Sequence, residues 1–276
     1  MSEAFQHLTA VVLDWAGTTV DYGSRAPAIA FQEIFRREGI EVTAAEAREP
    51  MGLAKRDHIA AILRMPNVAK QWQERFDREA GDEDIDRLYA DFLPLQKATL
   101  ADHSDVIPGV AAAIEECRQR GLKIGSSTGY THELMEVVCP RAADQGYAPD
   151  CLVCSEDVPV GRPAPWLLYE AARQIECFPM STIVKVDDTP VGIEAGRNAG
   201  AWTVGVTRSG NCVGLSEEEF AELSAIEQRE LLETATTRLR AAGADMIIQS
   251  VADLIPCLEQ FERRLAGGAM PRLPRR

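Results

Sequence analysis

Residues 11–21 read VVLDWAGTTVD. The apolar run from Ala10 to Leu13 predicts a short buried strand that ends at the carboxylate of Asp14. Open α/β sheets bind ligands at the carboxyl ends of their parallel strands. The Gly-Thr-Thr turn after Asp14 offers backbone N–H groups and hydroxyls that suit an oxyanion. The stretch therefore predicts an α/β fold with a candidate site at Asp14, although strands that end in Asp are common.

Composition limits the class of protein. A chain of 276 residues with 46% apolar content allows one large globular domain or two modest ones. The net charge of −14 argues against a nucleic-acid partner, which needs clustered Lys and Arg. We find no signal peptide and no apolar run long enough to span a membrane. Seven Cys, including the C-x-x-C pair Cys151 and Cys154, suit buried core positions in a reducing cytoplasm.

The chain divides into an α/β part and a helical insertion. Apolar residues at helical spacing, such as Ala30, Ile34 and Phe35, predict helices throughout residues 27–103. Strands are then expected at 122–126, 151–154, 182–186 and 202–206, with an edge strand at 245–248. Helices are expected at 131–145, 163–176, 190–199, 216–242 and 252–265. This alternation predicts a doubly wound parallel sheet with a Rossmann-like core (residues 1–22 and 104–276) and an inserted all-helical cap (residues 23–103).

Three more strand-end segments carry polar side chains. The hydroxyl-rich turn Ser126-Ser127-Thr128-Gly129 suits phosphate oxygens at a helix start, or is an ordinary capped turn. The paired carboxylates Asp187 and Asp188 suit Mg²⁺, whereas helix capping by Asp188 would explain only one of them. Arg162 precedes Pro163 at an expected helix start, where its guanidinium can bind two oxygens of an anion or remain solvated.

Lys55 lies in the insertion, near an expected helix start after Pro50. The helix dipole and the neighbouring Arg56 would both depress the pKa of Lys55, as an amine nucleophile requires. Alternatively, Lys55 is an ordinary surface residue, as most lysines are. However, Ala16, two residues after Asp14, cannot donate a proton. Either the chain has lost activity, or its leaving group needs no acid there, as when carbon leaves into a Schiff base.

These segments resemble the haloacid dehalogenase superfamily, whose phosphatases usually carry a second Asp at the place of Ala16. Lys55 combined with Ala16 closely resembles the phosphonoacetaldehyde hydrolase (phosphonatase) family. The matching stretches are LDWAGTTVDYGS, PMGLAKRDHI, KIGSSTGYT, VPVGRPAPW, KVDDT and EAGRNAGAWTVGV. The sequence departs from the pattern at Ser24, where some relatives have Cys, and at Asp187, where the superfamily often has Gly.

The resemblance implies hydrolysis of the C–P bond of 2-phosphonoacetaldehyde to acetaldehyde and phosphate. Asp14 would be the nucleophile and Lys55 the Schiff-base lysine. Mg²⁺ would be held by Asp14, the carbonyl of Ala16 and Asp188, with Asp187 as a further candidate. The phosphonate would be bound by Arg162 and the Ser126–Thr128 turn, and the cap side lined by Met51, Gly52, His58 and Tyr130.

The resemblance also implies a homodimer joined through the cap. The apolar residues Ile34, Phe35 and Trp72 belong either to that interface or to the core of the cap. Two other functions stay open. A phosphomonoester phosphatase or sugar-phosphate mutase would need a substitute acid, for which His58 and His132 are the candidates. A catalytically silent binding protein could also retain this fold.

Overall fold

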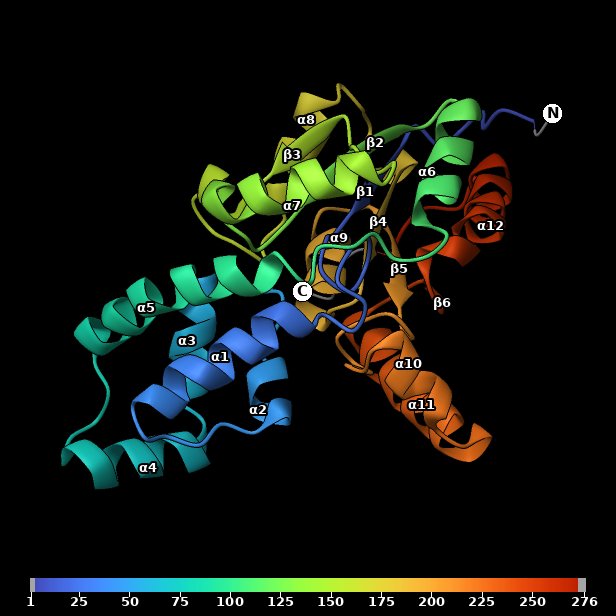
Figure 1. Cartoon of the computed structure of the whole chain (residues 1–276). Helices are drawn as coiled ribbons and strands as arrows, with labels where there is room; N and C mark the ends of the chain where they lie inside the picture. Colours follow the sequence, from blue (N-terminus) through green and yellow to red (C-terminus); the bar gives the residue numbers. More distant parts are fainter. Residues whose placement is uncertain (1–2, 273–276) are drawn as a thin grey trace.

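A computed structural model describes residues 3–272 (Figure 1). Its centre is a six-stranded parallel sheet with the strand order β3-β2-β1-β4-β5-β6. The strands are β1 (Ala10–Leu13), β2 (Lys123–Ser127), β3 (Cys151–Val153), β4 (Ile183–Asp187), β5 (Trp202–Val206) and β6 (Met246–Ile248). Each expected strand is present, to within one residue at either end. The doubly wound parallel sheet predicted from the sequence is therefore confirmed.

Alternating residues of the strands pack on opposite faces of the sheet. On one face, Val11 and Leu13 belong to one hydrophobic cluster with residues of α6 (Val110–Gln119), α7 (His132–Asp144) and α12 (Leu254–Ala266). On the other face, Ala10 and Val12 pack with α8 (Trp166–Gln174). Helices α9 (Pro190–Asn198) and α11 (Ala225–Ala242) extend this second layer through Ile193. Burial of both faces explains why the strands are apolar almost throughout.

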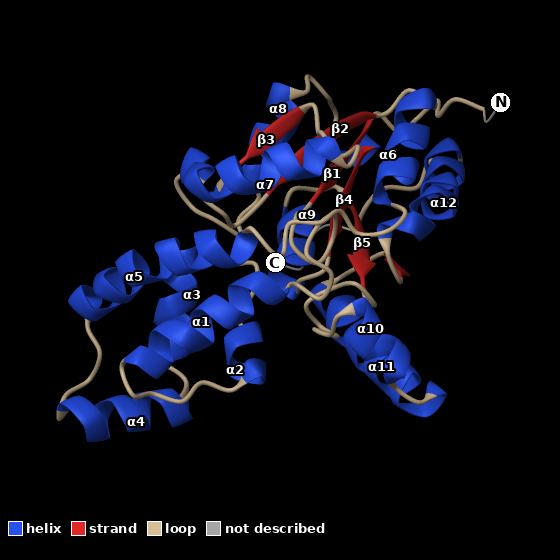
Figure 2. Ribbon diagram, in the orientation of Figure 1, coloured by secondary structure: helices blue, strands red, loops and turns tan. Residues whose placement is uncertain are grey.

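The insertion after β1 consists of helices joined by loops and contains no strand over residues 23–103, all of which the structure describes (Figure 2). It contains α1 (Arg25–Arg37), α2 (Ala44–Arg48), α3 (Lys55–Leu63), α4 (Pro66–Phe76) and α5 (Asp82–Leu100). These helices enclose a hydrophobic cluster of their own, to which Ile34, Phe35 and Trp72 belong. We therefore propose that residues 23–103 form a cap domain on a core of residues 1–22 and 104–276.

Two helix predictions are wrong in detail. Residues 216–242 form two helices, α10 (Glu217–Glu222) and α11, because Ser216 and Ser224 each start a helix with a capping box. Helix α8 begins at Trp166, so Arg162 and Pro163 lie in the preceding loop. Arg162 is consequently placed by loop contacts, which are described below.

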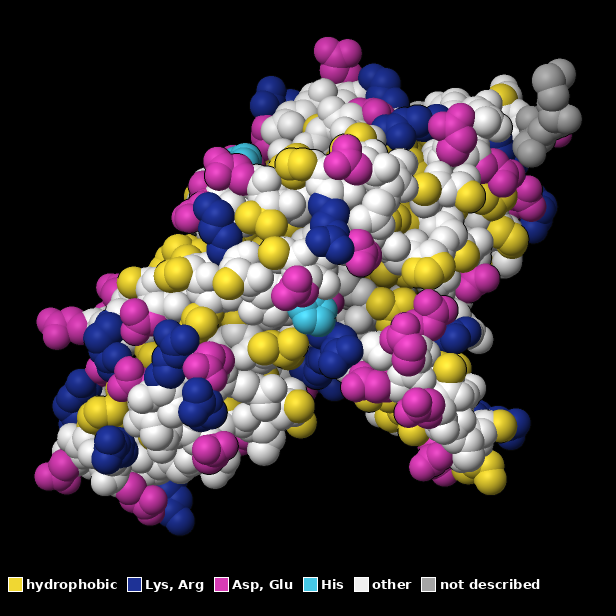
Figure 3. Space-filling model, viewed as in Figure 1, with side chains coloured by type: hydrophobic (Ala, Val, Ile, Leu, Met, Phe, Trp, Pro, Cys, Tyr) yellow, Lys and Arg dark blue, Asp and Glu magenta, His cyan; other side chains and the backbone are white. Residues whose placement is uncertain are grey.

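The surface shown in Figure 3 carries acidic and basic side chains interspersed. Over residues 3–272, no helix combines the length and the apolar character needed to span a membrane.

Candidate active site

The carboxyl ends of β1 and β4 bring three carboxylates together. Asp14 follows β1, Asp187 ends β4 and Asp188 comes next, and all three side chains are buried. Carboxylate oxygens of these residues lie within 4.8 Å of one another. Burial and the nearby Asp187 raise the pKa of Asp14, although the positive charges of Arg162 and Lys185 act to lower it. A bound cation would relieve this repulsion, so the donor set fits a hard divalent ion such as Mg²⁺.

Asp187 and Asp188 differ in their neighbours. Asp187 Oδ2 lies 3.0 Å from the ammonium of Lys185 and 3.4 Å from the Arg162 guanidinium. Its Oδ1 accepts hydrogen bonds from the backbone N–H and hydroxyl of Thr189. The positive charges and hydrogen bonds together lower the pKa of Asp187, although burial opposes them. Asp187 is thus neutralised by side chains of the protein.

Asp188 accepts hydrogen bonds from neutral donors. Its Oδ1 binds the Thr18 hydroxyl at 3.0 Å, and its Oδ2 binds the Asn211 backbone N–H at 2.7 Å. Burial, then Asp14 and Asp187, raise the pKa of Asp188 well above its ordinary value. A cation is the group that would keep Asp188 ionised. Asp188 is therefore better suited than Asp187 to bind a metal.

Arg162 connects the anionic groups. Its guanidinium donates to Asp14 Oδ1 at 2.6 Å and to the carbonyl of Ser127 at 2.7 Å. Burial alone would lower the pKa of Arg162, but Asp14 and Asp187 raise it. The side chain is 1% exposed and stays charged next to Asp14. The solvated position considered from the sequence is therefore wrong.

Lys55 is the first residue of α3, and only 4% of its surface is exposed. Its Nζ lies over the Tyr130 ring, 4.6 Å from the centroid, and 5.6 Å from that of Phe31. Burial lowers the pKa of Lys55 to about 7; Asp14 opposes this and Arg162 adds to it. The pKa is depressed as expected, but not by Arg56, which is exposed and paired with Asp86 at 2.6 Å.

A cavity between cap and core is lined by Asp14, Ala16, Ser24, Pro27, Met51, Gly52, Lys55, Thr128, Gly129, Tyr130, Arg162 and Thr189. The two parts touch through glycines. A Cβ at Gly129 would lie 2.8 Å from the carbonyl of Leu53, and one at Gly52 would lie 2.5 Å from Thr189 Oγ1. The cap is therefore closed over Asp14, with Lys55 inside.

Three of the expected binding residues do not line this cavity. Ser126 donates to the carbonyl of Cys151, behind the turn. Ser127 accepts from Arg162 and Lys185 and so supports other site residues. His58 is buried and stacked on Phe31, with its Nε2 2.9 Å from the carbonyl of Ala47. Burial and the Lys55 charge hold the pKa of His58 well below its ordinary value, so the ring is neutral.

Lys185 was not expected from the sequence. It lies within the apolar strand β4, is 1% exposed, and contacts Asp187 and Ser127. Its position offered a signal, because a lysine in a strand buried on both faces must find an anionic partner. Thr18 and Asn211, the donors to Asp188, lack such a signal because their contacts come from distant segments.

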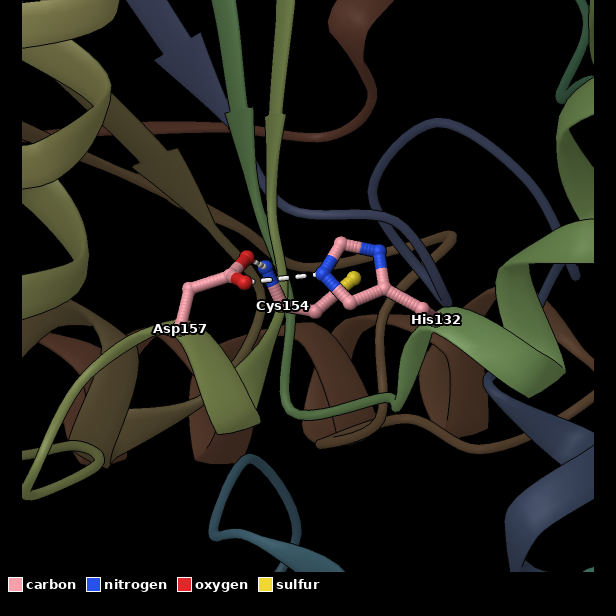
Figure 4. Close-up of side chains that lie close together, drawn as sticks. All are labelled: His132, Cys154 and Asp157. Carbon is pink, nitrogen blue, oxygen red and sulfur yellow. Dashed lines mark hydrogen bonds and ion pairs between the residues drawn. The ribbon is translucent and has the colours of Figure 1, made fainter.

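A second cluster of metal-ligand types lies at the end of β3 (Figure 4). His132, Cys154 and Asp157 lie close together, although no histidine was expected beside the C-x-x-C pair from sequence. His132 Nε2 is 2.8 Å from Asp157 Oδ1, and Asp157 Oδ2 accepts from the Cys154 backbone N–H. Burial raises the pKa of the Cys154 thiol to about 12. These contacts explain the cluster as a capped turn beside a core cysteine.

Known proteins of similar sequence are consistent with this site. A sequence model of haloacid dehalogenase-like hydrolases matches residues 8–200. The chain thus belongs to this class of hydrolase. The phosphonoacetaldehyde hydrolase of Paraburkholderia phytofirmans is 46% identical over 266 residues, which cover 96% of this chain and 100% of that protein. That of Syntrophobacter fumaroxidans is 44% identical and covers 95% of both chains.

Among solved structures, a phosphonoacetaldehyde hydrolase like protein from Oleispira antarctica is 43% identical. The match covers 98% of both chains with a TM-score of 0.95. Within the class, the chain is therefore a member of the phosphonoacetaldehyde hydrolase family.

Proposed function

We propose that this chain hydrolyses the C–P bond of 2-phosphonoacetaldehyde to acetaldehyde and phosphate. The observation that carries the proposal is the buried amine of Lys55, in the same closed cavity as Asp14 and Arg162. Because burial lowers its pKa to about 7, Lys55 can supply a neutral, nucleophilic amine near neutral pH. The family of the chain supports the choice of substrate.

The reaction begins at the carbonyl group. The neutral amine of Lys55 adds to the aldehyde carbon, and the adduct takes up one proton and loses water, which leaves a protonated imine. The Asp14 carboxylate then attacks phosphorus, and the C–P bond breaks. Its electron pair moves into the imine and gives a neutral enamine, so no bare carbanion forms and no acid is needed at Ala16. Protonation at carbon and addition of water release acetaldehyde and the free Lys55 amine.

The aspartyl phosphate on Asp14 is cleaved by a second water. Phosphate leaves and the Asp14 carboxylate is restored. One water is lost in imine formation and two are consumed afterwards, so the net reaction uses one water. The guanidinium of Arg162 orients Asp14 through the 2.6 Å contact and offers its charge to the phosphonate oxygens.

Asp14, the carbonyl of Ala16 and Asp188 would hold Mg²⁺, which would screen the two anions that must meet. We assign Asp187 a different task. It balances the buried charges of Lys185 and Arg162 and thereby fixes the Arg162 guanidinium beside Asp14.

The phosphatase alternative lacks support for its acid. His58 is buried and neutral, with Nε2 at the carbonyl of Ala47. His132 is about half exposed, pairs with Asp157, and is absent from the residues that line the cavity. Neither histidine is placed to protonate an ester oxygen beside Asp14. A silent binding protein would have no need of a buried lysine with a depressed pKa.

An assay of product release separates these functions. The protein is incubated with phosphonoacetaldehyde or with p-nitrophenyl phosphate, each with and without Mg²⁺. We expect equal amounts of acetaldehyde and phosphate from the phosphonate, dependent on Mg²⁺, and little p-nitrophenol. Turnover of the ester alone would favour a phosphatase, and turnover of neither would favour a binding protein.

We also propose that the protein acts in the cytoplasm and forms a homodimer. The dimer rests on family resemblance, because Ile34, Phe35 and Trp72 are buried in the core of the cap and are not available to a partner. Sedimentation equilibrium at micromolar protein tests it, and a monomer there would contradict the proposal.

A further inference from the structure

The contacts of one cap residue extend to the candidate metal ligand Asp188. Arg48 is the last residue of α2 in the cap. Its NH1 donates to the carbonyl of Gly23 at 2.7 Å and to that of Ser24 at 3.2 Å, where the chain crosses from core to cap. Its NH2 donates to the carbonyl of Gly214 at 2.9 Å, in a core loop of residues 207–215 that follows β5. The guanidinium thus ties the cap to both the crossing and this core loop.

Arg48 and Asn211 form a reciprocal pair across the domain boundary. Arg48 NH1 donates to Asn211 Oδ1, and Asn211 Nδ2 donates to the backbone carbonyl of Arg48, both at 3.1 Å. Two hydrogen bonds hold the side chain of Asn211 in one orientation. Its backbone N–H, in turn, donates to Asp188 Oδ2 at 2.7 Å. Asn211 therefore connects Arg48 of the cap to the Asp188 carboxylate.

The core loop is packed tightly around Asp188. A Cβ at Gly210 would lie 2.6 Å from the Cβ of Asp188, so the loop backbone is in direct contact with it. The Ser209 hydroxyl donates to the carbonyl of Gly17, in the turn after Asp14, and the Ser209 carbonyl accepts from the Gly23 N–H. A shift of this loop would therefore alter the surroundings of Asp188, the Asp14 turn and the crossing together.

We propose that Arg48 is a positioning residue that couples closure of the cap to the metal affinity of Asp188. When the cap opens, Arg48 leaves with it while Asn211 stays on the core. Asn211 then loses both side-chain bonds, and its N–H no longer holds the Asp188 carboxylate in place. Because coupling between two equilibria is reciprocal, a metal bound at Asp188 would also favour the closed cap. This inference rests on the proposed function, since it assumes the metal at Asp14 and Asp188.

Two matched substitutions test the coupling. Arg48→Lys keeps the charge, but an ammonium cannot reproduce the four contacts of the planar guanidinium. Arg238→Lys is the control. Arg238 pairs with Glu49 at 2.5 Å, so it also joins core to cap beside Arg48, but this pair is exposed and does not contact Asp188. Thermal unfolding and the hydrogen exchange of the central strands verify that both variants are folded.

The first measurement is hydrogen exchange of the peptide that covers residues 207–215, without metal. Arg48→Lys should accelerate the exchange of the Asn211 amide, and Arg238→Lys should not. The second measurement is the affinity for Mn²⁺ alone. It is obtained from the electron paramagnetic resonance signal of the free ion during a titration. Arg48→Lys should weaken it roughly tenfold, as expected when hydrogen bonds to a charged group are lost. Asn211→Ala should weaken it similarly, and the double variant should be no weaker than either single variant.

Unchanged exchange and Mn²⁺ affinity in Arg48→Lys would overturn the proposal, as would equal effects of Arg48→Lys and Arg238→Lys. Both results leave the proposed reaction intact if the wild-type protein still releases acetaldehyde and phosphate. A wild-type protein that binds no Mn²⁺ would overturn the coupling and the metal centre together.

Discussion

Replacing Lys55 with methionine should inactivate the protein and stabilise it. Lys55 is buried, and burial lowers its pKa from 10.5 in the unfolded chain to about 7. Between these values the unfolded chain binds more protons than the folded one, so the stability of the wild-type protein rises with pH across this window. The depressed pKa of Lys55 lowers the free energy of unfolding by about 4 kcal/mol at pH 7 and by less than ~1 kcal/mol at pH 10.5. Methionine fills the same space without a charge.

Urea unfolding of the wild-type protein and Lys55→Met at pH 7 and pH 10.5 measures this difference. We expect Lys55→Met to be more stable by about 4 kcal/mol at pH 7, with most of the gain absent at pH 10.5. Lys70→Met is the matched control. Lys70 is three-quarters exposed on α4, so its replacement should change stability by less than ~0.5 kcal/mol at either pH. A gain that does not depend on pH, or a loss of stability at pH 7, would refute the argument that burial depresses the pKa of Lys55.

The pH dependence of kcat/KM should show a limb near pH 7, because only the neutral amine of Lys55 attacks the aldehyde; a limb near pH 10 would count against this. Asp14→Asn should abolish phosphate release and leave the circular dichroism spectrum unchanged, and residual activity within about tenfold of wild type would remove Asp14 as nucleophile. Asp188→Asn should weaken Mn²⁺ binding in a titration, whereas Asp187→Asn should mainly lower stability in urea by about 3 kcal/mol. The reverse pattern would exchange their roles.

The sequence predicted the sheet well because each strand is a short apolar run with turn residues at its ends. β1 and β5 have the predicted bounds, and the ends of parallel strands meet at one edge regardless of how loops are built. Asp14 and Asp188 could therefore be placed near each other from sequence alone. The helical character of residues 27–103 followed from the spacing of their apolar residues.

Contacts between distant segments could not be predicted. The depressed pKa of Lys55 has the expected direction but a different cause, since burial under the closed cap is a property of the tertiary structure. The Arg48–Asn211 pair joins residues that are 163 positions apart. Ser126 lies within strand β2, and its hydroxyl donates to the carbonyl of Cys151 on the neighbouring strand, so it does not reach the cavity. In each case the local pattern leaves the direction of a side chain open.

The central claim is an imine between Lys55 and the substrate, and borohydride trapping tests it most directly. Borohydride added during turnover should reduce the imine to a stable secondary amine and inactivate the protein only when substrate or acetaldehyde is present. Peptide mass mapping should then locate a two-carbon group on Lys55, and Lys55→Arg should neither trap it nor cleave the C–P bond. A label on Lys97 or Lys123, or full activity in Lys55→Arg, would contradict the mechanism.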